Sequence, residues 1–359
     1  MLGKAKQSLL SFAFLSLNRN FADMKFSWKK AVQIILPFAL GGSMLYWMYQ
    51  GFPLTEVSDV LLHEMKWEWM LLSFIPGILA QVLRALRWKQ TLSPMGEHPR
   101  LSTCCEAIFL SYAASLILPR IGEVLRCGIL GRHENTSFPK ALGTVVTERA
   151  VDTLLVMLLV AIVTMMQFSV FSDFFNITGL NLGATLSRFT HTGIFFTGLC
   201  IVFMVGMAFL LFRRLAFMRK AKSMVMGLME GVMSLKNINH LPLYLCYSIG
   251  IWVAYFFHYY LTFFCFDFTS SLGIMAGLVS FCVGTIAVIV PTPNGAGPWH
   301  FAVKTILVLY GLTEAEAITY TLIVHSIQTL LLVALGIYAL VALSWKKSRN
   351  NIYTSSISQ

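Results

Sequence analysis

Apolar stretches long enough to cross a membrane alternate with short polar segments along the whole chain. A transmembrane helix needs about 20 consecutive, mostly apolar residues. Six stretches reach this length without interruption, at residues 31–50, 68–88, 141–168, 190–212, 241–266 and 315–343. The pattern predicts an all-α fold, a polytopic transmembrane helix bundle with about six full spans.

Two further apolar regions, 103–132 and 271–311, are each broken by a polar motif that contains proline. The first break is Leu-Pro-Arg-Ile-Gly-Glu at 118–123, and the second is Pro-Thr-Pro-Asn-Gly-Ala-Gly-Pro at 291–298. Proline ends helices and glycine permits tight turns. We interpret both regions as re-entrant helical hairpins, and a pair of short, kinked spans is the alternative for each.

The Lys and Arg residues near the span ends indicate the orientation, because such residues gather on the cytoplasmic side. They precede the first span and follow the second, the fourth and the last. This distribution predicts that both termini are cytoplasmic and that the two hairpins enter from opposite faces. Such an arrangement is typical of transporters with inverted repeats, and we expect a repeat of this kind here.

The composition excludes a soluble domain of this length. Of the 359 residues, 57% are hydrophobic and 12% are charged, whereas soluble domains have about 25% charged residues. The net charge of +11 fits loops that face anionic headgroups, and we predict no nucleic-acid partner. Because no nucleotide-binding or metal-ligand spacing occurs, we also predict no cofactor and no metal, and we favour a transporter over an enzyme.

We divide the chain into four segments. Residues 1–24 form an N-terminal tail, and Met24 is an alternative start of translation. Residues 25–345 form a single transmembrane domain. Within it, residues 213–240 form a Met-rich, basic amphipathic segment on the cytoplasmic interface. Residues 346–359 are expected to be a disordered cytoplasmic tail.

The first broken motif carries charges inside an apolar region, where each charge costs about 2.5–3.5 kcal/mol on insertion scales. Arg120, Glu123 and Arg126 follow one another at i, i+3 spacing, so a helix that starts after Pro119 would carry them in one row. Together with Gly122, this helix start offers N–H groups and guanidinium groups to a phosphate. The alternative is a mutually satisfied ion network.

A second charged group lies a few turns into the apolar stretch 141–168. Arg149 is expected to pair with Asp152 at i, i+3, and Glu148 lies on the same helix face as Asp152. We predict that Glu148 or Asp152 also pairs with Arg120 or Arg126. A polar path and an ion pair that clamps two helices both remain open as its role. Outside this group, Arg84 and Arg87 lie near the end of a span, and we expect them to extend to the membrane surface.

The second broken motif supplies the remaining candidates. Its prolines and glycines interrupt the helix, and the helix that comes next would point its N-terminus towards the interior. For His300 alone, a hydrogen-bonded structural role is the favoured interpretation. The candidate site residues of this region are Pro293, Asn294, Gly295, Gly297, His300 and Lys304.

Residues 118–126, followed by Thr-Glu-Arg-Ala-Val-Asp at 147–152, resemble the signature of the lysylphosphatidylglycerol synthase transmembrane family. Residues 291–297 resemble that family's second, glycine-rich motif. The resemblance covers about residues 25–345 and implies the flippase-like part of the multiple peptide resistance factors, which we expect to lack the soluble synthase domain here. One departure is His300, which stands where relatives often have an acidic residue. By resemblance, the lipid headgroup path would be lined by Arg120, Glu123, Arg126, Glu148, Arg149 and Asp152.

We therefore expect a lipid translocator of the bacterial cytoplasmic (inner) membrane, which moves a phospholipid or lipid-linked headgroup through a polar midplane site. Its expected partners are anionic or aminoacylated phospholipids or lipid-linked intermediates, and further copies of the chain in a homo-oligomer. One alternative is a membrane-embedded transferase acting on a lipid or polyprenyl phosphate, with Glu148, Asp152 or His300 as the base. Another is a non-transporting scaffold that binds a lipid synthase through residues 213–236.

Overall fold

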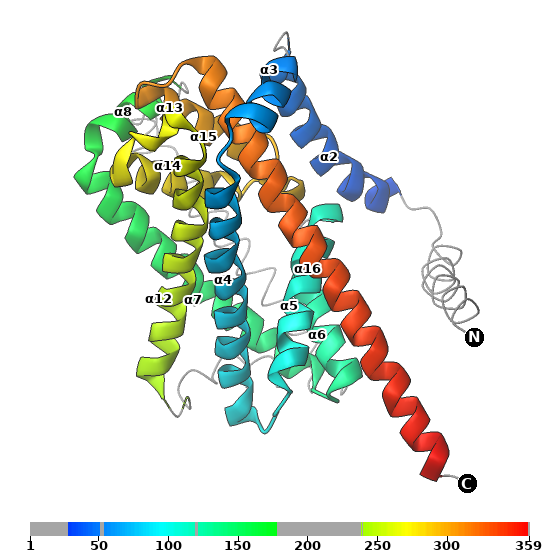
Figure 1. Cartoon of the computed structure of the whole chain (residues 1–359). Coiled ribbons are helices and arrows are strands. Elements are labelled where there is room, and N and C mark those ends of the chain that lie inside the picture. Colours follow the sequence, from blue (N-terminus) through cyan, green and yellow to red (C-terminus); the bar gives the residue numbers. More distant parts are fainter. Residues whose placement is uncertain (1–27, 51–53, 119–120, 178–237, 239, 358–359) are drawn as a thin grey trace.

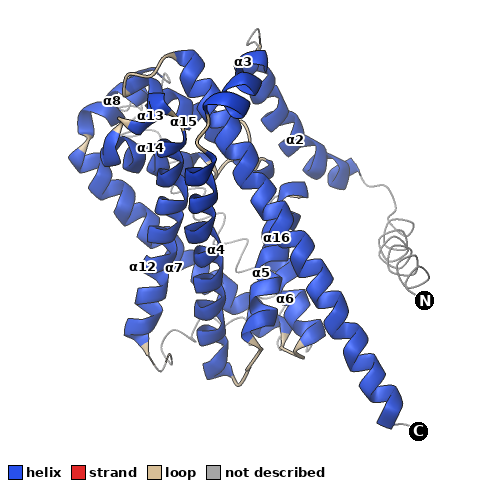
Figure 2. Ribbon diagram, viewed as in Figure 1, coloured by secondary structure: helices blue, strands red, loops and turns tan. Residues whose placement is uncertain are grey.

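The computed structural model describes residues 28–50, 54–118, 121–177, 238 and 240–357. Within these residues the chain forms α-helices and short 3-10 and π segments but no strand, which confirms the all-α prediction (Figure 2). Three predicted features lie outside them: the tail 1–24, the span 190–212 and, apart from residues 238 and 240, the amphipathic segment 213–240.

Four of the described helices are long and apolar enough to cross a membrane. They confirm four of the six predicted spans, and the first predicted span also forms a helix, α2 (Trp28–Tyr49). In α7 only 11% of the apolar window is buried, as expected of a helix that faces lipid. The four helices are α4 (Trp67–Leu92), α7 (Phe138–Met166), α12 (Leu241–Tyr260) and α16 (Glu314–Ile357).

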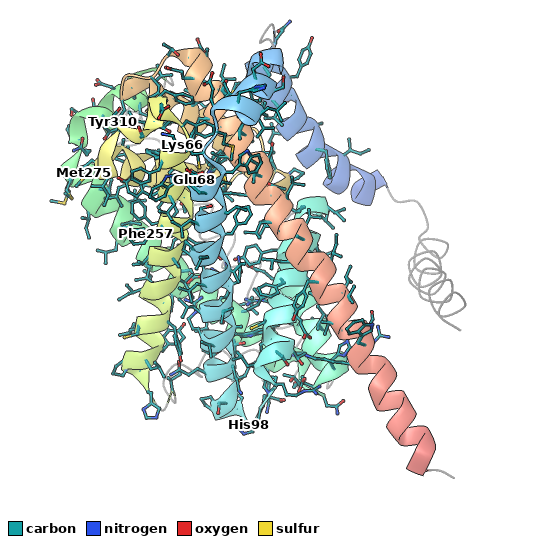
Figure 3. The ribbon with its side chains drawn as sticks, in the orientation of Figure 1. Lys66, Glu68, His98, Phe257, Met275 and Tyr310 are labelled. Atoms are coloured by element: carbon teal, nitrogen blue, oxygen red, sulfur yellow. The ribbon has the colours of Figure 1, made fainter. Side chains whose placement is uncertain are left out.

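The bundle has two ends, which Figure 3 marks by Lys66 and Glu68 on one side and by His98 on the other. We call them the Lys66 end and the His98 end. Helices α4 and α12 run antiparallel between them, because the backbone N–H of Lys66 donates to the Cys265 carbonyl at one end and the Gln90 amide donates to the His240 carbonyl at the other.

Two helical hairpins enter the bundle from opposite ends (Figure 1). The first consists of α5 (Leu101–Ile117) and α6 (Ile121–His133), and both of its outer ends lie at the His98 end. The second consists of α14 (Gly273–Ala287) and α15 (Pro298–Leu309), and it enters from the Lys66 end. Each hairpin returns to the end from which it came, as the re-entrant prediction requires.

The order of the elements repeats with inverted direction. In the first half, a span that runs towards the His98 end (α4) is followed by the α5–α6 hairpin and by a span that runs back (α7). In the second half, α12 runs towards the Lys66 end and is followed by the α14–α15 hairpin and by α16. This agrees with the predicted inverted repeat.

Short elements cover the Lys66 end around these spans. One of them, α13, begins at Asp267, which forms an ion pair with Lys66. Another, α8, buries Phe171 and Phe174 in an apolar cluster with residues of α14 and α15. The elements are α3 (Leu54–Asp59), the π-helical segment η1 (Val60–Glu64), α8 (Phe168–Ile177), the 3-10 segment η5 (Leu261–Cys265) and α13 (Asp267–Ser270).

At the C-terminus the structure differs from the expected disordered tail, because α16 continues to Ile357. The Lys346 ammonium donates to both carboxylate oxygens of Glu106 at 2.7 Å and to Ser102 at 3.0 Å. These bonds fix α16 against α5, and extending an existing helix is far easier than nucleating one.

Two apolar clusters flank the centre of the bundle. One lies towards the Lys66 end and contains Met70, Phe263 and Tyr320. The other lies towards the His98 end and contains Trp88 and Ile108. The buried charged side chains lie where α4, α6, α7 and α12 meet, and the two hairpin tips lie beside them.

Candidate functional site

A buried ion pair joins the first hairpin to α7. The Arg126 guanidinium donates to the Glu148 carboxylate at 2.8 Å, and the two residues are 2% and 0% exposed. The guanidinium carbon also lies 4.6 Å from the centre of the Trp88 ring, whose N–H donates to Thr144 at 3.0 Å. The predicted pairing of Glu148 with Arg126 is confirmed.

Asp152 accepts contacts from three arginines on α4 and α7. Its carboxylate oxygens lie 2.6 Å from Arg87, 3.1 Å from Arg149 and 3.4 Å from Arg84. The predicted i, i+3 pair of Arg149 and Asp152 is therefore confirmed. Arg87 also donates to Ser248 of α12 at 3.1 Å, so the pair of Arg87 and Asp152 links α4, α7 and α12.

Arg84 and Arg87 do not extend to the membrane surface as expected, because they are 4% and 0% exposed. Packing of α12 along α4 covers them, and Asp152 supplies the opposite charge that makes their burial tolerable. The sequence did contain a signal: two arginines at i, i+3 within an apolar span need a carboxylate from another span. Asp152 was a candidate ion-pair partner in the sequence, but for Arg149, Arg120 or Arg126 and not for the arginines of α4.

The buried network has an excess of positive charge. Arg149 lies 3.3 Å from Glu123 of α6, so four arginines (84, 87, 126 and 149) face three carboxylates (123, 148 and 152) among the described residues. Arg120, the remaining charged candidate, lies outside the described residues. An excess cation away from water calls for an anion, and Arg149, whose side chain is 39% exposed, can reach one.

Glycine allows the first hairpin to close tightly. A Cβ atom on Gly122 would lie 2.1 Å from the Ser111 carbonyl oxygen and 2.6 Å from the Ser115 hydroxyl. Since no side chain fits there, α5 and α6 approach closely, and this contact brings the two serines beside Glu123 and Arg126.

The second hairpin tip is held by backbone geometry and neutral hydrogen bonds. Asn294 has a φ of +53° and Gly295 a φ of +71°, so the chain turns sharply at these two residues. The side-chain amide of Asn294 donates to the Thr329 hydroxyl of α16 at 2.7 Å, and the backbone carbonyl oxygen of Asn294 lies 3.0 Å from His325. Neutral groups therefore anchor this tip to α16.

A cavity of about 250 Å³ lies between the two tips, and we call it the tip cavity. It brings together the two motifs that are 170 residues apart in the chain, together with Arg84 of α4 and Arg149 of α7. Its polar lining is formed by Arg84, Ser111, Tyr112, Ser115, Glu123, Arg126, Arg149, Thr292 and Asn294, and Gly122 and Gly295 supply backbone.

Both motifs lie within the part of the chain that matches a known family. The family described as the Lysylphosphatidylglycerol synthase TM region matches residues 34–336, which is most of the chain. The chain belongs to this family. Comparison with curated proteins and with solved structures found no match. Membership of the lysylphosphatidylglycerol synthase transmembrane family relates this multi-pass membrane protein to membrane phospholipids.

A second cavity of about 390 Å³ adjoins the tip cavity, and we call it the aromatic cavity. Five residues line both cavities, among them Arg84, Arg149 and Asn294. The aromatic cavity extends between α4, α12, α14 and α16. Its lining includes aromatic, histidine and glutamine side chains, namely Gln81, Trp252, Tyr255, His258, Tyr259, Phe281, Trp299, His325 and Gln328.

Four other candidate residues line neither the tip cavity nor the aromatic cavity: Pro293, Gly297, His300 and Lys304. His300 is 3% exposed, and its Nδ1 accepts a hydrogen bond from the Gly297 N–H at 3.4 Å. A Cβ on Gly297, whose φ is +90°, would lie 3.0 Å from the Gly41 carbonyl of α2. Pro293 begins the 3-10 segment η6 (Pro293–Gly295). These three residues shape and cap the loop that carries Asn294.

Lys304 also lies away from the two cavities. Its ammonium donates to Glu314 at 2.6 Å, in the connection between α15 and α16 at the Lys66 end. No group of three or more His, Cys, Asp or Glu side chains in the described part of the chain is arranged to hold a metal ion. The tip cavity thus combines arginine, serine and backbone groups, which are the groups that bind phosphate.

Proposed function

We propose that this protein moves a lipid with an anionic headgroup between the two leaflets, and that the headgroup passes through the tip cavity. The observation that carries the proposal is the convergence of two hairpins from opposite ends on one cavity whose charged lining, among the described residues, is three arginines and one glutamate. A headgroup in this cavity is reachable in principle from either end, while the acyl chains stay in the surrounding lipid.

Arg149 is the group best placed to take the phosphate. Its side chain is partly exposed, lines both cavities and already contacts the carboxylates of Glu123 and Asp152. A guanidinium can donate two parallel hydrogen bonds to a phosphate. A phosphate would bind the Arg149 Nη1 group, because Nε faces Glu123 at 3.3 Å and Nη2 faces Asp152 at 3.1 Å, and both carboxylates would stay in place.

The carboxylates limit how tightly an anion is held. Among the described residues, Asp152, Glu148 and Glu123 neutralise three of the four arginine charges, so the headgroup meets a single excess cation. A translocation site must bind its cargo strongly enough to replace water and weakly enough to let it leave. The balance of four arginines and three carboxylates suits this requirement.

The charges at the two ends support an orientation for this transport. We infer that the His98 end is cytoplasmic, because Lys and Arg gather there, and that the membrane is the bacterial cytoplasmic membrane. The basic residues at the His98 end are Lys89, Arg100, Arg132, Lys140 and Lys346, and the acidic residues at the Lys66 end are Glu64, Glu68, Asp267, Glu314 and Glu316.

The test is lipid movement in proteoliposomes that contain purified protein and fluorescent phosphatidylglycerol. Arg149→Gln removes a charged hydrogen-bond donor worth about 1.5–3 kcal/mol, so we expect movement to slow about tenfold or more. Arg100→Gln is the matched control, since Arg100 is also a partly exposed arginine in a 2.8 Å pair with a glutamate, but it lies at the His98 end.

We expect Arg100→Gln to transport at the wild-type rate. Wild-type protein that moves lipid no faster than empty vesicles would refute the proposal, and equal rates for Arg149→Gln and wild type would refute the assigned site. Mass spectrometry of the recovered lipid separates transport from the transferase alternative, because transport leaves the lipid chemically unchanged.

A further inference from the structure

The aromatic cavity continues directly from the groups that we assign to the phosphate. Arg84, Arg149 and Asn294 line both cavities. A phosphate bound between Arg84 and Arg149 therefore places the next atoms of its headgroup at the entrance of the aromatic cavity. The chemistry of that cavity then decides which headgroups fit, and this selectivity rests on the proposed function.

The two cavities offer little to a cationic headgroup. None of the described residues that line the aromatic cavity is acidic. In the tip cavity, Glu123 already contacts Arg149 at 3.3 Å. An ammonium group in either cavity would instead face the guanidinium groups of Arg84 and Arg149, and it would be repelled by them.

Two of the aromatic rings are not free to compensate for this. Aromatic faces attract cations, including ammonium groups. The rings of Tyr112 and Tyr255, however, already face a cation, because the Arg84 guanidinium carbon lies 5.6 Å and 5.7 Å from their centres. The hydroxyls of these tyrosines lie 3.0 Å apart and bond to each other, which fixes both rings on Arg84.

A buried acceptor and a buried donor of the aromatic cavity lack a partner among the described residues. Gln81 is 3% exposed, and its Oε1 accepts no hydrogen bond; the indole Nε1 of Trp252 donates none. Buried polar groups are rarely left unpaired in native proteins. A hydroxyl group both donates and accepts, so a hydroxylated ligand can satisfy both kinds of group.

We infer that the aromatic cavity binds a neutral, hydroxylated group, such as glycerol or a sugar, that is linked to the phosphate of the lipid. The protein then selects phosphodiester lipids with hydroxylated headgroups and rejects aminoacylated ones. Gln81 and Trp252 are its specificity residues: Gln81 accepts from a hydroxyl of the headgroup and Trp252 donates to one.

The experiment compares four lipids in proteoliposomes: phosphatidylglycerol, a glycosyl-phosphoryl polyprenol, phosphatidic acid and lysyl-phosphatidylglycerol. For wild type we expect at least one of the two hydroxylated lipids to move faster than phosphatidic acid, and the lysylated lipid to move slowest. Which hydroxylated lipid is faster distinguishes the glycerol source from the sugar source.

The variants Gln81→Leu and Trp252→Phe test the residues. Each removes a hydrogen bond worth about 0.5–1.5 kcal/mol, so we expect the rate ratio of hydroxylated lipid to phosphatidic acid to fall about two- to tenfold. Because the ratio is measured within each variant, differences in the amount of folded protein cancel. Gln90→Leu, on the same helix but bonded to the His240 carbonyl, should keep the wild-type ratio.

Three results would overturn the inference. Equal rates for all four lipids, or fastest movement of the lysylated lipid, would overturn the selectivity and leave the transport proposal standing. Equal slowing of the hydroxylated lipid and phosphatidic acid in both variants would show that the two residues are structural. No movement of any lipid by wild type would refute the proposed function together with this inference.

Discussion

The tip of the α5–α6 hairpin is surrounded by charge, whereas the tip of the α14–α15 hairpin is fixed by neutral groups. Arg126 and Glu123 of the first hairpin reach carboxylate and guanidinium partners on α7. Asn294 of the second hairpin bonds to the hydroxyl of Thr329 and to His325. The two hairpins occupy equivalent positions in the inverted repeat, but charged groups surround the first tip and neutral groups hold the second.

In the proposed transport, charge selection would therefore belong to one half of the repeat. The first half supplies Arg84, Arg126 and Arg149 to the tip cavity, and the second half supplies Thr292, Asn294 and backbone. Changes in the first half should therefore alter both stability and anion selection. Changes in the second half should alter the shape of the cavity at a smaller energetic cost.

The largest effect is expected for Asp152→Ala, which leaves three arginines without their shared carboxylate. Removing one partner of a buried ion pair costs about 3–5 kcal/mol, so we expect a large loss of thermal stability in detergent. The matched control is Asp267→Ala, because Asp267 is 85% exposed in its pair with Lys66 and exposed pairs contribute about 0–1 kcal/mol. Similar melting temperatures for the two variants would contradict the buried network.

Gly122→Ala should have the next largest effect. The added methyl group would lie 2.1 Å from the Ser111 carbonyl oxygen, and overpacking of this kind costs about 1–3 kcal/mol. Gly128→Ala is the control on the same helix, because nothing lies within 4 Å of its Cβ position. There, alanine should be neutral or stabilising, by up to about 1 kcal/mol. Thermal unfolding of both variants measures the difference, and equal stabilities would show that the two helices of the hairpin are not in close contact.

In the second hairpin we expect a smaller loss. Asn294→Ala removes the 2.7 Å bond to Thr329, worth about 0.5–1.5 kcal/mol, and places alanine in a left-handed conformation that asparagine tolerates better. Asn294→Gly loses the same bond but tolerates the positive φ. We therefore expect glycine to be the less destabilising replacement in a thermal unfolding assay. If alanine were as well tolerated as glycine, the turn would not require the left-handed conformation.

The smallest effect concerns Glu134, which lies just after the first hairpin at the His98 end. Burial raises its pKa, but hydrogen bonds from Thr103 and Arg100 outweigh this effect and hold the pKa below the ordinary value of 4.5. The ionised carboxylate therefore stabilises the folded protein at pH values above 4.5. This stabilisation is lost as the pH falls through the lowered pKa. Melting temperatures between pH 6 and pH 3 should fall less steeply for Glu134→Gln than for wild type. Parallel curves of melting temperature against pH for the two proteins would show that Glu134 does not contribute in this way.

The sequence was sufficient for the spans that the structure describes, for the hairpins and for part of the charge network. Apolar length located the helices, and the proline motifs located the two breaks. Arg126 and Glu148 could be paired because a lone charge inside a span requires a partner. What the sequence could not show is that Asp152 reaches α4, since contacts between residues 65 positions apart depend on how the helices pack.

Local motifs were harder to interpret than the pattern of spans. His300 lies just after a glycine-rich break, a position that fits either a residue that binds a ligand or a residue that caps a helix. Its orientation towards the Gly297 N–H shows that it caps the helix. Lys304 lies one turn later, and only the fold shows that this turn points to Glu314 at the Lys66 end.

The central claim is that the two hairpin tips form one headgroup site, and a double-mutant cycle of transport rates tests it most directly. Movement of phosphatidylglycerol would be measured in proteoliposomes for wild type, Arg149→Gln, Asn294→Gly and the double variant. Groups that act on one bound headgroup couple by about 0.5–3 kcal/mol, so we expect the double variant to be little slower than Arg149→Gln alone. Rates that fall by the product of the two single effects would show that the tips act independently, which contradicts a shared headgroup site.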